Sequence, residues 1–265
     1  MKFLHAADLH LDRSFEGLTS VPEHFQERLI TANQKMLKNI VDTAITQAVD
    51  FVLLVGDTFH QNRPTLKTQR YFFQEMDRLA EAAIPVFMNF GNHDFYQADR
   101  YWFAFPENIQ LFDEERVETK KLVTNSGEKI AITSFSYLHP TIEALMIEQF
   151  PRKEDVDFHI GMYHGGQMPY APLSELVAKG YDYWALGHIH VPQILSEKPY
   201  VIYPGTPQGH TQKEMNLTGV TLVESQGNQL IPTTVSVEAV CWRRQTLSLA
   251  NVRQPNYFRW FGNSL

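Results

Sequence analysis

Residues 51–64 read FVLLVGDTFHQNRP, and this stretch decides the fold class. Its first five residues are apolar, which is the length of a buried strand, and a Gly-Asp pair ends the run. Residues 2–7 (KFLHAA) lead in the same way into Asp8-Leu9-His10, and residues 84–88 (IPVFM) lead toward Gly91-Asn92-His93-Asp94. Polar groups that follow successive strands are typical of α/β proteins, whose sites lie in loops at strand ends.

Helical patterns separate these three strands. Apolar residues recur at helical spacing between positions 25 and 48, which predicts a long amphipathic helix. Pro64 and Thr65 then open a segment, 66–83, that contains neither Gly nor Pro, which predicts a second helix. The N-terminal half therefore alternates strand and helix.

The C-terminal half continues this alternation less regularly, which gives an α/β (α+β) class. So many strands and helices predict two sheets packed together with helices outside, although the sheet order does not follow from one sequence. The predicted elements are strands at 129–135, 157–163, 182–186 and 200–203, helices near 141–149 and 173–179, and a closing hairpin of 219–224 and 230–238 around Ser225 to Asn228.

Composition narrows the class of protein. With 265 residues, 43% of them apolar, the chain can bury one large core. No run approaches the roughly 18 apolar residues that span a bilayer, and polar residues interrupt the N-terminal stretch, so we expect a cytoplasmic protein.

The single cysteine, Cys241, excludes an internal disulfide and Cys-rich zinc sites. The net charge of −7 argues against a basic nucleic-acid surface, although bound cations would supply positive charge where a phosphate sits.

Asp, Asn and His residues follow five of the predicted strands. In Asp8-Leu9-His10, alternation along an extended chain puts both polar side chains on one side, so both can reach one ion. Oxygen and imidazole ligands without thiolates suit manganese first, with iron, zinc or magnesium as alternatives. Two such ions about 3.5 to 4 Å apart can bridge a nucleophilic water, and Asp57 is the natural bridging carboxylate. The candidate polar groups after these strands are Asp8, His10, Asp57, Asn92, His93, Asp94, His164, His188 and His190.

Each fragment alone is also common in turns and caps, so the prediction of a site depends on the combination. Other histidines lack this context and are expected to be ordinary surface or core residues. They are His5, His24, His139, His159 and His210.

The ordered set DLH, GD, GNHD, YHGG and GHIH resembles the calcineurin-like metallophosphoesterase superfamily. The segments AADLHLDRSFEG and GDTFHQNRP, and the pairing of GHIH with YPGTPQ, resemble bacterial DNA repair nucleases of the SbcD and YhaO type. This resemblance implies a four-layer αββα sandwich of two mixed β-sheets flanked by helices. It covers residues 1–240 as the nuclease domain and leaves 241–265 as a C-terminal tail. This tail is too short for the capping domain of such nucleases, so it is either the start of a truncated capping domain or a departure from the family.

The resemblance also implies roles for single residues. His93 would contact the phosphate and assist the leaving oxygen, Asp94 would orient the His93 imidazole, and His60 would lie near the scissile phosphate. As a lone residue, His60 fits a structural hydrogen-bonding role equally well. One metal would be held by Asp8, His10, Asp57 and His190, and the other by Asp57, Asn92, His164 and His188, with Asp57 as the bridge.

The implied reaction is in-line hydrolysis of a DNA phosphodiester by a metal-activated water, without a covalent intermediate. The implied partners are DNA, a second copy of the chain and a coiled-coil ATPase of the SbcC type. Two alternatives remain: a phosphatase or small-molecule phosphodiesterase on the same scaffold, which the acidic charge favours, and a non-catalytic metal-binding scaffold.

An aromatic concentration on the second predicted helix and just after GNHD has two interpretations. Core packing is the first, and a dimer surface formed by part of the cluster is the second. The residues are Tyr71, Phe72, Phe73, Phe95, Tyr96, Tyr101, Trp102 and Phe103.

Overall fold

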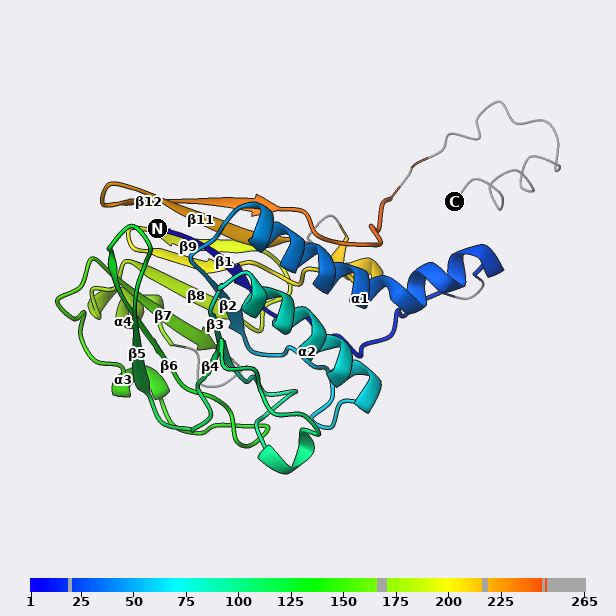
Figure 1. The fold of residues 1–265 in the computed structure, drawn as a ribbon, viewed down its shortest axis with the longest axis horizontal. Coiled ribbons are helices and arrows are strands. Elements are labelled where there is room, and N and C mark those ends of the chain that lie inside the picture. The colour runs from blue at the N-terminus through cyan, green and yellow to red at the C-terminus, as the bar shows by residue number, and fades with distance from the viewer. Residues whose placement is uncertain (19–20, 166–170, 216–218, 245, 247–265) are drawn as a thin grey trace.

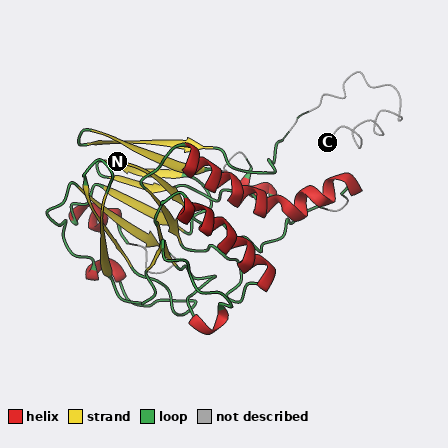
Figure 2. Cartoon of the chain, in the orientation of Figure 1, coloured by secondary structure: helices red, strands yellow, loops and turns green. Residues whose placement is uncertain are grey.

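Two six-stranded β-sheets lie face to face in the computed structural model, which describes residues 1–18, 21–165, 171–215, 219–244 and 246. Helices cover the outer faces, as Figure 1 shows by label and Figure 2 by colour. The four-layer αββα sandwich of mixed sheets is therefore confirmed. The tail expected at 241–265 lies largely outside the described residues.

The first sheet has the order β12-β11-β1-β2-β3-β4. Its central strands β1, β2 and β3 pair in parallel, and each is buried almost throughout, which explains why they are continuous apolar runs. The predicted hairpin of β11 and β12 forms the edge of the sheet opposite β4, and its turn contains Gly227, which has a φ of 59°. The strands are β1 (Lys2–Ala6), β2 (Phe51–Val55), β3 (Val86–Asn89), β4 (Ile109–Leu111), β11 (Val220–Gln226) and β12 (Gln229–Val235).

The second sheet has the order β5-β6-β7-β8-β10-β9. Strands β6, β7, β8 and β10 pair in parallel, and β5 and β9 are antiparallel edges. The four inner strands were all predicted, whereas both edge strands were not. The strands are β5 (Glu118–Val123), β6 (Lys129–Ser134), β7 (Phe158–His164), β8 (Tyr183–Gly187), β9 (Gln193–Glu197) and β10 (Tyr200–Tyr203).

The helices follow the predictions with one correction. The hydroxyl of Thr65 caps α2 by accepting a hydrogen bond from the N–H of Thr68 at 3.2 Å. The prediction of a helix over 141–149 was wrong for 141–145, which are not helical. Ile142 buries its side chain in the same cluster as Met146 without a helical backbone, so packing overrides the helical pattern there. The helices are α1 (Glu23–Thr46), α2 (Leu66–Glu81), α3 (Met146–Gln149), α4 (Leu173–Ala178) and the 3₁₀ turns η1 (Ala98–Arg100) and η2 (Gln212–Glu214).

Three apolar clusters hold the four layers together. Successive side chains of a strand point to opposite faces, so Phe3 packs between the sheets while Leu4 packs under α1 and α2. On the other side, Trp184 packs with residues of α3 and α4. Full burial of one such side chain contributes about 1.5–3 kcal/mol.

Most of the aromatic concentration belongs to this packing. Phe72 and Phe73 lie on the buried face of α2, and Tyr101 packs against the same cluster. Trp102 and Phe103 instead expose 75% and 36% of their surface. Core packing is thus confirmed for the larger part, and the dimer surface stays a prediction.

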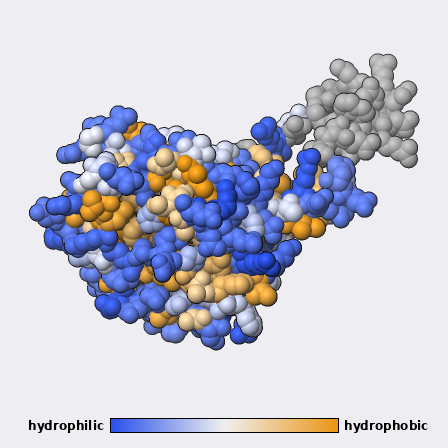
Figure 3. All heavy atoms as spheres, in the orientation of Figure 1, coloured by the Kyte–Doolittle hydropathy of each residue, from blue (hydrophilic) through white to orange (hydrophobic). Residues whose placement is uncertain are grey.

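The face seen in Figure 3 is mostly hydrophilic, with separate apolar patches. Within the described residues, none of the helices combines the length and the apolarity that crossing a bilayer requires.

Candidate metal centre

The carboxyl ends of the central strands in both sheets carry the candidate ligands. In the first sheet, β1 leads into Asp8 and His10, β2 into Asp57, and β3 into Asn92. In the second sheet, β7 ends at His164 and β8 leads into His188 and His190. The sandwich therefore gathers side chains that lie up to 182 residues apart in the chain at one end of its two sheets.

The backbone at these strand ends takes an unusual conformation. Four of these residues have a positive φ, which residues other than glycine rarely adopt. The φ values are 53° at Asp8, 45° at His10, 50° at Asp57 and 97° at His188. Such residues cost of order 1–3 kcal/mol each and persist where the surroundings fix them. The N–H of His10 donates to the carbonyl of Asp57 at 3.0 Å. This hydrogen bond joins the segment after β1 to the segment after β2.

The first cluster consists of Asp8, His10 and His190, whose ligand atoms all lie within 4.8 Å of one another. The Nε2 atoms of His10 and His190 are 3.1 Å apart, and Nε2 of His190 is 4.0 Å from Oδ1 of Asp8. Asp8 and His10 are fully buried. Two imidazole lone pairs and a buried carboxylate that face one point form a cation site.

The second cluster consists of Asp57, His164 and His188, again within 4.8 Å. The amide oxygen of Asn92 joins them, because it lies 3.2 Å from Nε2 of His164 and 3.2 Å from Nδ1 of His188. A carboxylate, an amide oxygen and two imidazoles are a donor set that divalent transition metals accept.

Asp57 lies between the two clusters. Its Oδ2 atom is 3.5 Å from Nε2 of His164 and 3.9 Å from Nε2 of His10. Gly91 permits this approach, because a Cβ there would lie 2.2 Å from Oδ1 of Asp57. A Cβ at Gly56 would lie 2.3 Å from Nδ1 of His164. The donors therefore converge only because small residues stand beside them, and they fit two neighbouring cations.

Burial and mutual charge set the pKa values of these groups. Burial raises the pKa of Asp8 to about 6 and lowers that of His188 to about 4. Burial works against ionisation of Asp57, yet the nearby His164 and His10 outweigh it and lower the Asp57 pKa. The same pairing raises the pKa of His164 to about 9, against the effect of its own burial. A cation held by His164 would take the place of that proton, so its binding would release a proton here.

His60 and His93 lie at the edge of the first cluster. Nδ1 of His60 is 3.3 Å from Nδ1 of His10, and the rings of His60 and His93 stack with centroids 4.8 Å apart. Nδ1 of His93 lies 3.2 Å from the carbonyl oxygen of His60, to which it donates a hydrogen bond. His93 is exposed, and Nδ1 is the ring nitrogen that this hydrogen bond occupies.

Asp94 has a different environment from the expected one. Its buried carboxylate accepts hydrogen bonds from the N–H groups of Asp57, Phe59 and Gly91 at 3.1, 3.2 and 2.8 Å. The expectation that Asp94 orients the His93 imidazole is therefore wrong in this structure, since the His60 carbonyl takes that place. The reason is that Asp94 turns inward, where main-chain donors of two strand ends converge.

Two acidic residues around the site were not predicted. Asp12 accepts hydrogen bonds from the N–H groups of His60 and Gln61 at 2.6 and 3.2 Å, and its place two residues after His10 was the available signal. Glu214 lies 2.7 Å from Nδ1 of His190. It follows no strand, so the pattern of polar groups after strands does not include it.

The remaining histidines are surface or core residues, as expected. His24 and His139 are exposed, and the other three are fully buried. Nε2 of His5 donates to the Leu186 carbonyl. Nε2 of His210 donates to Oδ1 of Asn33.

Comparison with known proteins points to one family. The calcineurin-like phosphoesterase family matches residues 1–192. The chain is 34% identical over 262 residues to the metallophosphoesterase YhaO of Bacillus subtilis, across 96% of this chain and 64% of YhaO. It is 25% identical over 272 residues to the DNA double-strand break repair protein Mre11 of Sulfurisphaera tokodaii, across 96% of this chain and 67% of that protein.

A further relative is a subunit of the nuclease SbcCD of Bacillus subtilis, 24% identical over 271 residues, across 85% of this chain and 66% of the relative. The chain thus spans about two thirds of the length of each of these relatives. Among solved structures, TT1561 of Thermus thermophilus matches 89% of this chain and 99% of its own with a TM-score of 0.50 and 12% identity. At that identity the likeness shows the fold alone.

Proposed function

The chain belongs to the calcineurin-like phosphoesterase family, and from that membership we propose that it is a two-metal nuclease that hydrolyses DNA phosphodiester bonds. The observation that carries the proposal is the position of Asp57 between two clusters of cation ligands, with exposed His93 beside it. Family membership implies phosphoester hydrolysis, and the donor set implies two divalent cations.

We assign one cation to Asp8, His10, Asp57 and His190, and the other to Asp57, Asn92, His164 and His188. Manganese fits this mixed set best, with iron, zinc or magnesium as alternatives. When bound, two such cations activate a water molecule and neutralise charge on the phosphoryl group, which allows in-line hydrolysis without a covalent intermediate.

The proposed task of His93 is to assist the leaving oxygen. Its Nδ1 is occupied as a donor to the His60 carbonyl, so Nε2 is the atom that can carry a second proton toward the substrate. Asp94 supports the position of His93 indirectly, because its carboxylate accepts hydrogen bonds from the main-chain N–H groups of Asp57 and Gly91. We therefore give Asp94 a positioning role.

His60 has a proposed role as a hydrogen-bond donor to a phosphate oxygen. When Nε2 of His10 faces a cation, the proton of His10 is on Nδ1, which then donates to Nδ1 of His60. The remaining proton of His60 is on Nε2, and this neutral form can donate without any change of charge.

DNA is the proposed substrate because the similar proteins include one named for DNA double-strand break repair and one named as a nuclease subunit. The segment 56–64, which contains His60, supports the same choice. By the same similarity we propose a homodimer and a coiled-coil ATPase partner of the SbcC type. A phosphatase or small-molecule phosphodiesterase remains the second candidate, favoured by the net charge of −7.

The deciding experiment compares substrates under one metal condition. The protein is incubated with Mn²⁺ and single-stranded DNA, double-stranded DNA, and mono- and diesters of nitrophenyl phosphate. We expect DNA cleavage that EDTA abolishes and that excess Mn²⁺ restores. Hydrolysis of the small esters without cleavage of either DNA form would replace the nuclease proposal with the second candidate.

A further inference from the structure

Glu214 stands directly behind the imidazole of His190. Its Oε1 atom is 2.7 Å from Nδ1 of His190, while Nε2 of the same ring faces His10 across the first cluster. The Glu214 side chain is 8% exposed. An ionised carboxylate only accepts hydrogen bonds, so Nδ1 of His190 carries the proton and Nε2 keeps its lone pair for a cation.

The carboxylate of Glu214 is itself held from several sides. Oε1 also accepts from Nη1 of Arg13 at 3.2 Å. Oε2 accepts from the N–H groups of His210 and Thr211 at 2.7 and 3.0 Å. These hydrogen bonds to both oxygens hold the Glu214 carboxylate in place. The carboxylate in turn orients the ring of His190.

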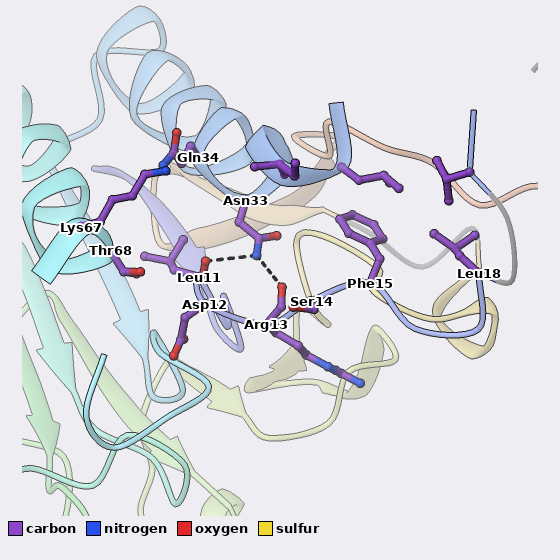
Figure 4. Close-up of a pocket in the computed structure, with 13 residues that line it drawn as sticks. Leu11, Asp12, Arg13, Ser14, Phe15, Leu18, Asn33, Gln34, Lys67 and Thr68 are labelled. Atoms are coloured by element: carbon purple, nitrogen blue, oxygen red, sulfur yellow. Dashed lines mark hydrogen bonds between the residues drawn. The ribbon is translucent and has the colours of Figure 1, made fainter. Parts of the chain in front are cut away.

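These contacts extend to the loop that follows β1. Nδ2 of Asn33 in α1 donates to the carbonyls of Leu11 and Arg13 at 3.1 and 2.8 Å, as the dashed lines in Figure 4 show beside a cavity of about 470 Å³. Oδ1 of Asn33 accepts from Nε2 of His210 at 2.8 Å. A single polar network thus ties the His10 loop, the Glu214 turn and His190 together.

The second cluster has a different support. Nδ1 of His164 is 3.0 Å from the main-chain carbonyl of Val55, so a neutral oxygen stands behind this ligand. A carboxylate behind an imidazole makes the ring more basic than a carbonyl does, and loss of such a partner costs about 10- to 100-fold in metal affinity. The two cation sites therefore differ in what supports them.

We infer that Glu214, anchored by Arg13, is a positioning residue that selectively strengthens cation binding at the Asp8, His10 and His190 site. This inference rests on the proposed two-metal function. It goes beyond that function by predicting that one side chain controls one of the two sites, from outside both ligand sets.

Isothermal titration of the metal-free protein with Mn²⁺ tests the inference, because it reads binding without a substrate. We expect two Mn²⁺ per wild-type chain. In Glu214→Ala, one Mn²⁺ should bind about 10- to 100-fold more weakly while the other keeps its affinity, and Glu214→Gln, which retains an acceptor for His190, should recover part of the loss.

Glu75→Ala is the matched control, because Glu75 is also buried and paired with an arginine, Arg78, but lies on α2 away from the centre. It should leave both affinities unchanged. Circular dichroism of each variant reports whether the fold is retained. The inference is overturned if folded Glu214→Gln and Glu214→Ala bind both ions as the wild type does, or if both ions weaken equally. A wild-type protein that binds no Mn²⁺ would instead refute the two-metal proposal itself.

Discussion

The N–H of His93 donates a hydrogen bond of 3.0 Å to Oδ1 of Asp57. The same main-chain segment therefore presents the proposed proton donor and fixes the carboxylate that lies between the two clusters. This contact therefore couples the position of His93 to that of the Asp57 carboxylate, to which we assign both cations.

Replacement of Asp57 should affect both cations at once. Asp57→Asn keeps the shape and the oxygen that receives the His93 N–H, but it removes the negative charge between the clusters. We expect weaker binding of both Mn²⁺ ions and a loss of hydrolysis of about a thousandfold or more, because the cations supply several kcal/mol of transition-state stabilisation. Titration calorimetry and a DNA cleavage assay measure the two effects. Unchanged binding at either site would contradict the shared position of Asp57.

Replacement of His93 should separate chemistry from metal binding. His93→Ala removes the proposed proton donor but none of the assigned ligands, so both Mn²⁺ ions should stay bound while phosphodiester cleavage falls about 10²- to 10⁴-fold. The loss should be smaller for a nitrophenyl diester, whose leaving group needs little protonation. His139→Ala, another exposed histidine, serves as the control. Metal loss in His93→Ala would show that His93 has the wrong assignment.

Replacement of Asp94 tests whether this residue supports the main chain. Asp94→Ala leaves the N–H groups of Asp57, Phe59 and Gly91 without their acceptor, and we expect the free energy of unfolding to fall by about 3 kcal/mol. Chemical denaturation of the metal-free protein measures this change. An unaltered stability combined with the kinetic pattern of His93→Ala would restore the original expectation that Asp94 orients the imidazole.

The central strands were predictable because burial on both faces leaves a plain signal. Phe51 to Val55 are apolar throughout, since their side chains enter either the cluster between the two sheets or the cluster under α1 and α2. Three of the four edge strands, β4, β5 and β9, gave no such signal: β9 is exposed along most of its length, and β4 has three residues. Their strand conformation comes from pairing with a neighbour, which one sequence does not reveal.

In the site, too, some features were predictable from the sequence and others depend on tertiary contacts. Each candidate ligand comes after a strong strand, so the sequence predicted the convergence that the structure places at one end of the sandwich. Glu214 and the inward turn of Asp94 depend on tertiary contacts instead. Nothing in the spacing of Glu214 and His190 indicates that a 3₁₀ turn brings the carboxylate to the imidazole.

The stability of the metal-free protein should depend on pH through His5, which is not among the assigned cation ligands. Burial lowers the pKa of His5 from 6.5 to about 3. Between these pH values the unfolded chain binds a proton at this residue and the folded chain does not, so the free energy of unfolding falls as the pH falls from 6.5 toward 3. His5→Gln can still donate to the Leu186 carbonyl and accept from the Tyr183 hydroxyl, yet it does not titrate. Urea unfolding at several pH values should therefore show a shallower acid loss in His5→Gln than in the wild type, and equal slopes for the two proteins would disprove the buried neutral state of His5.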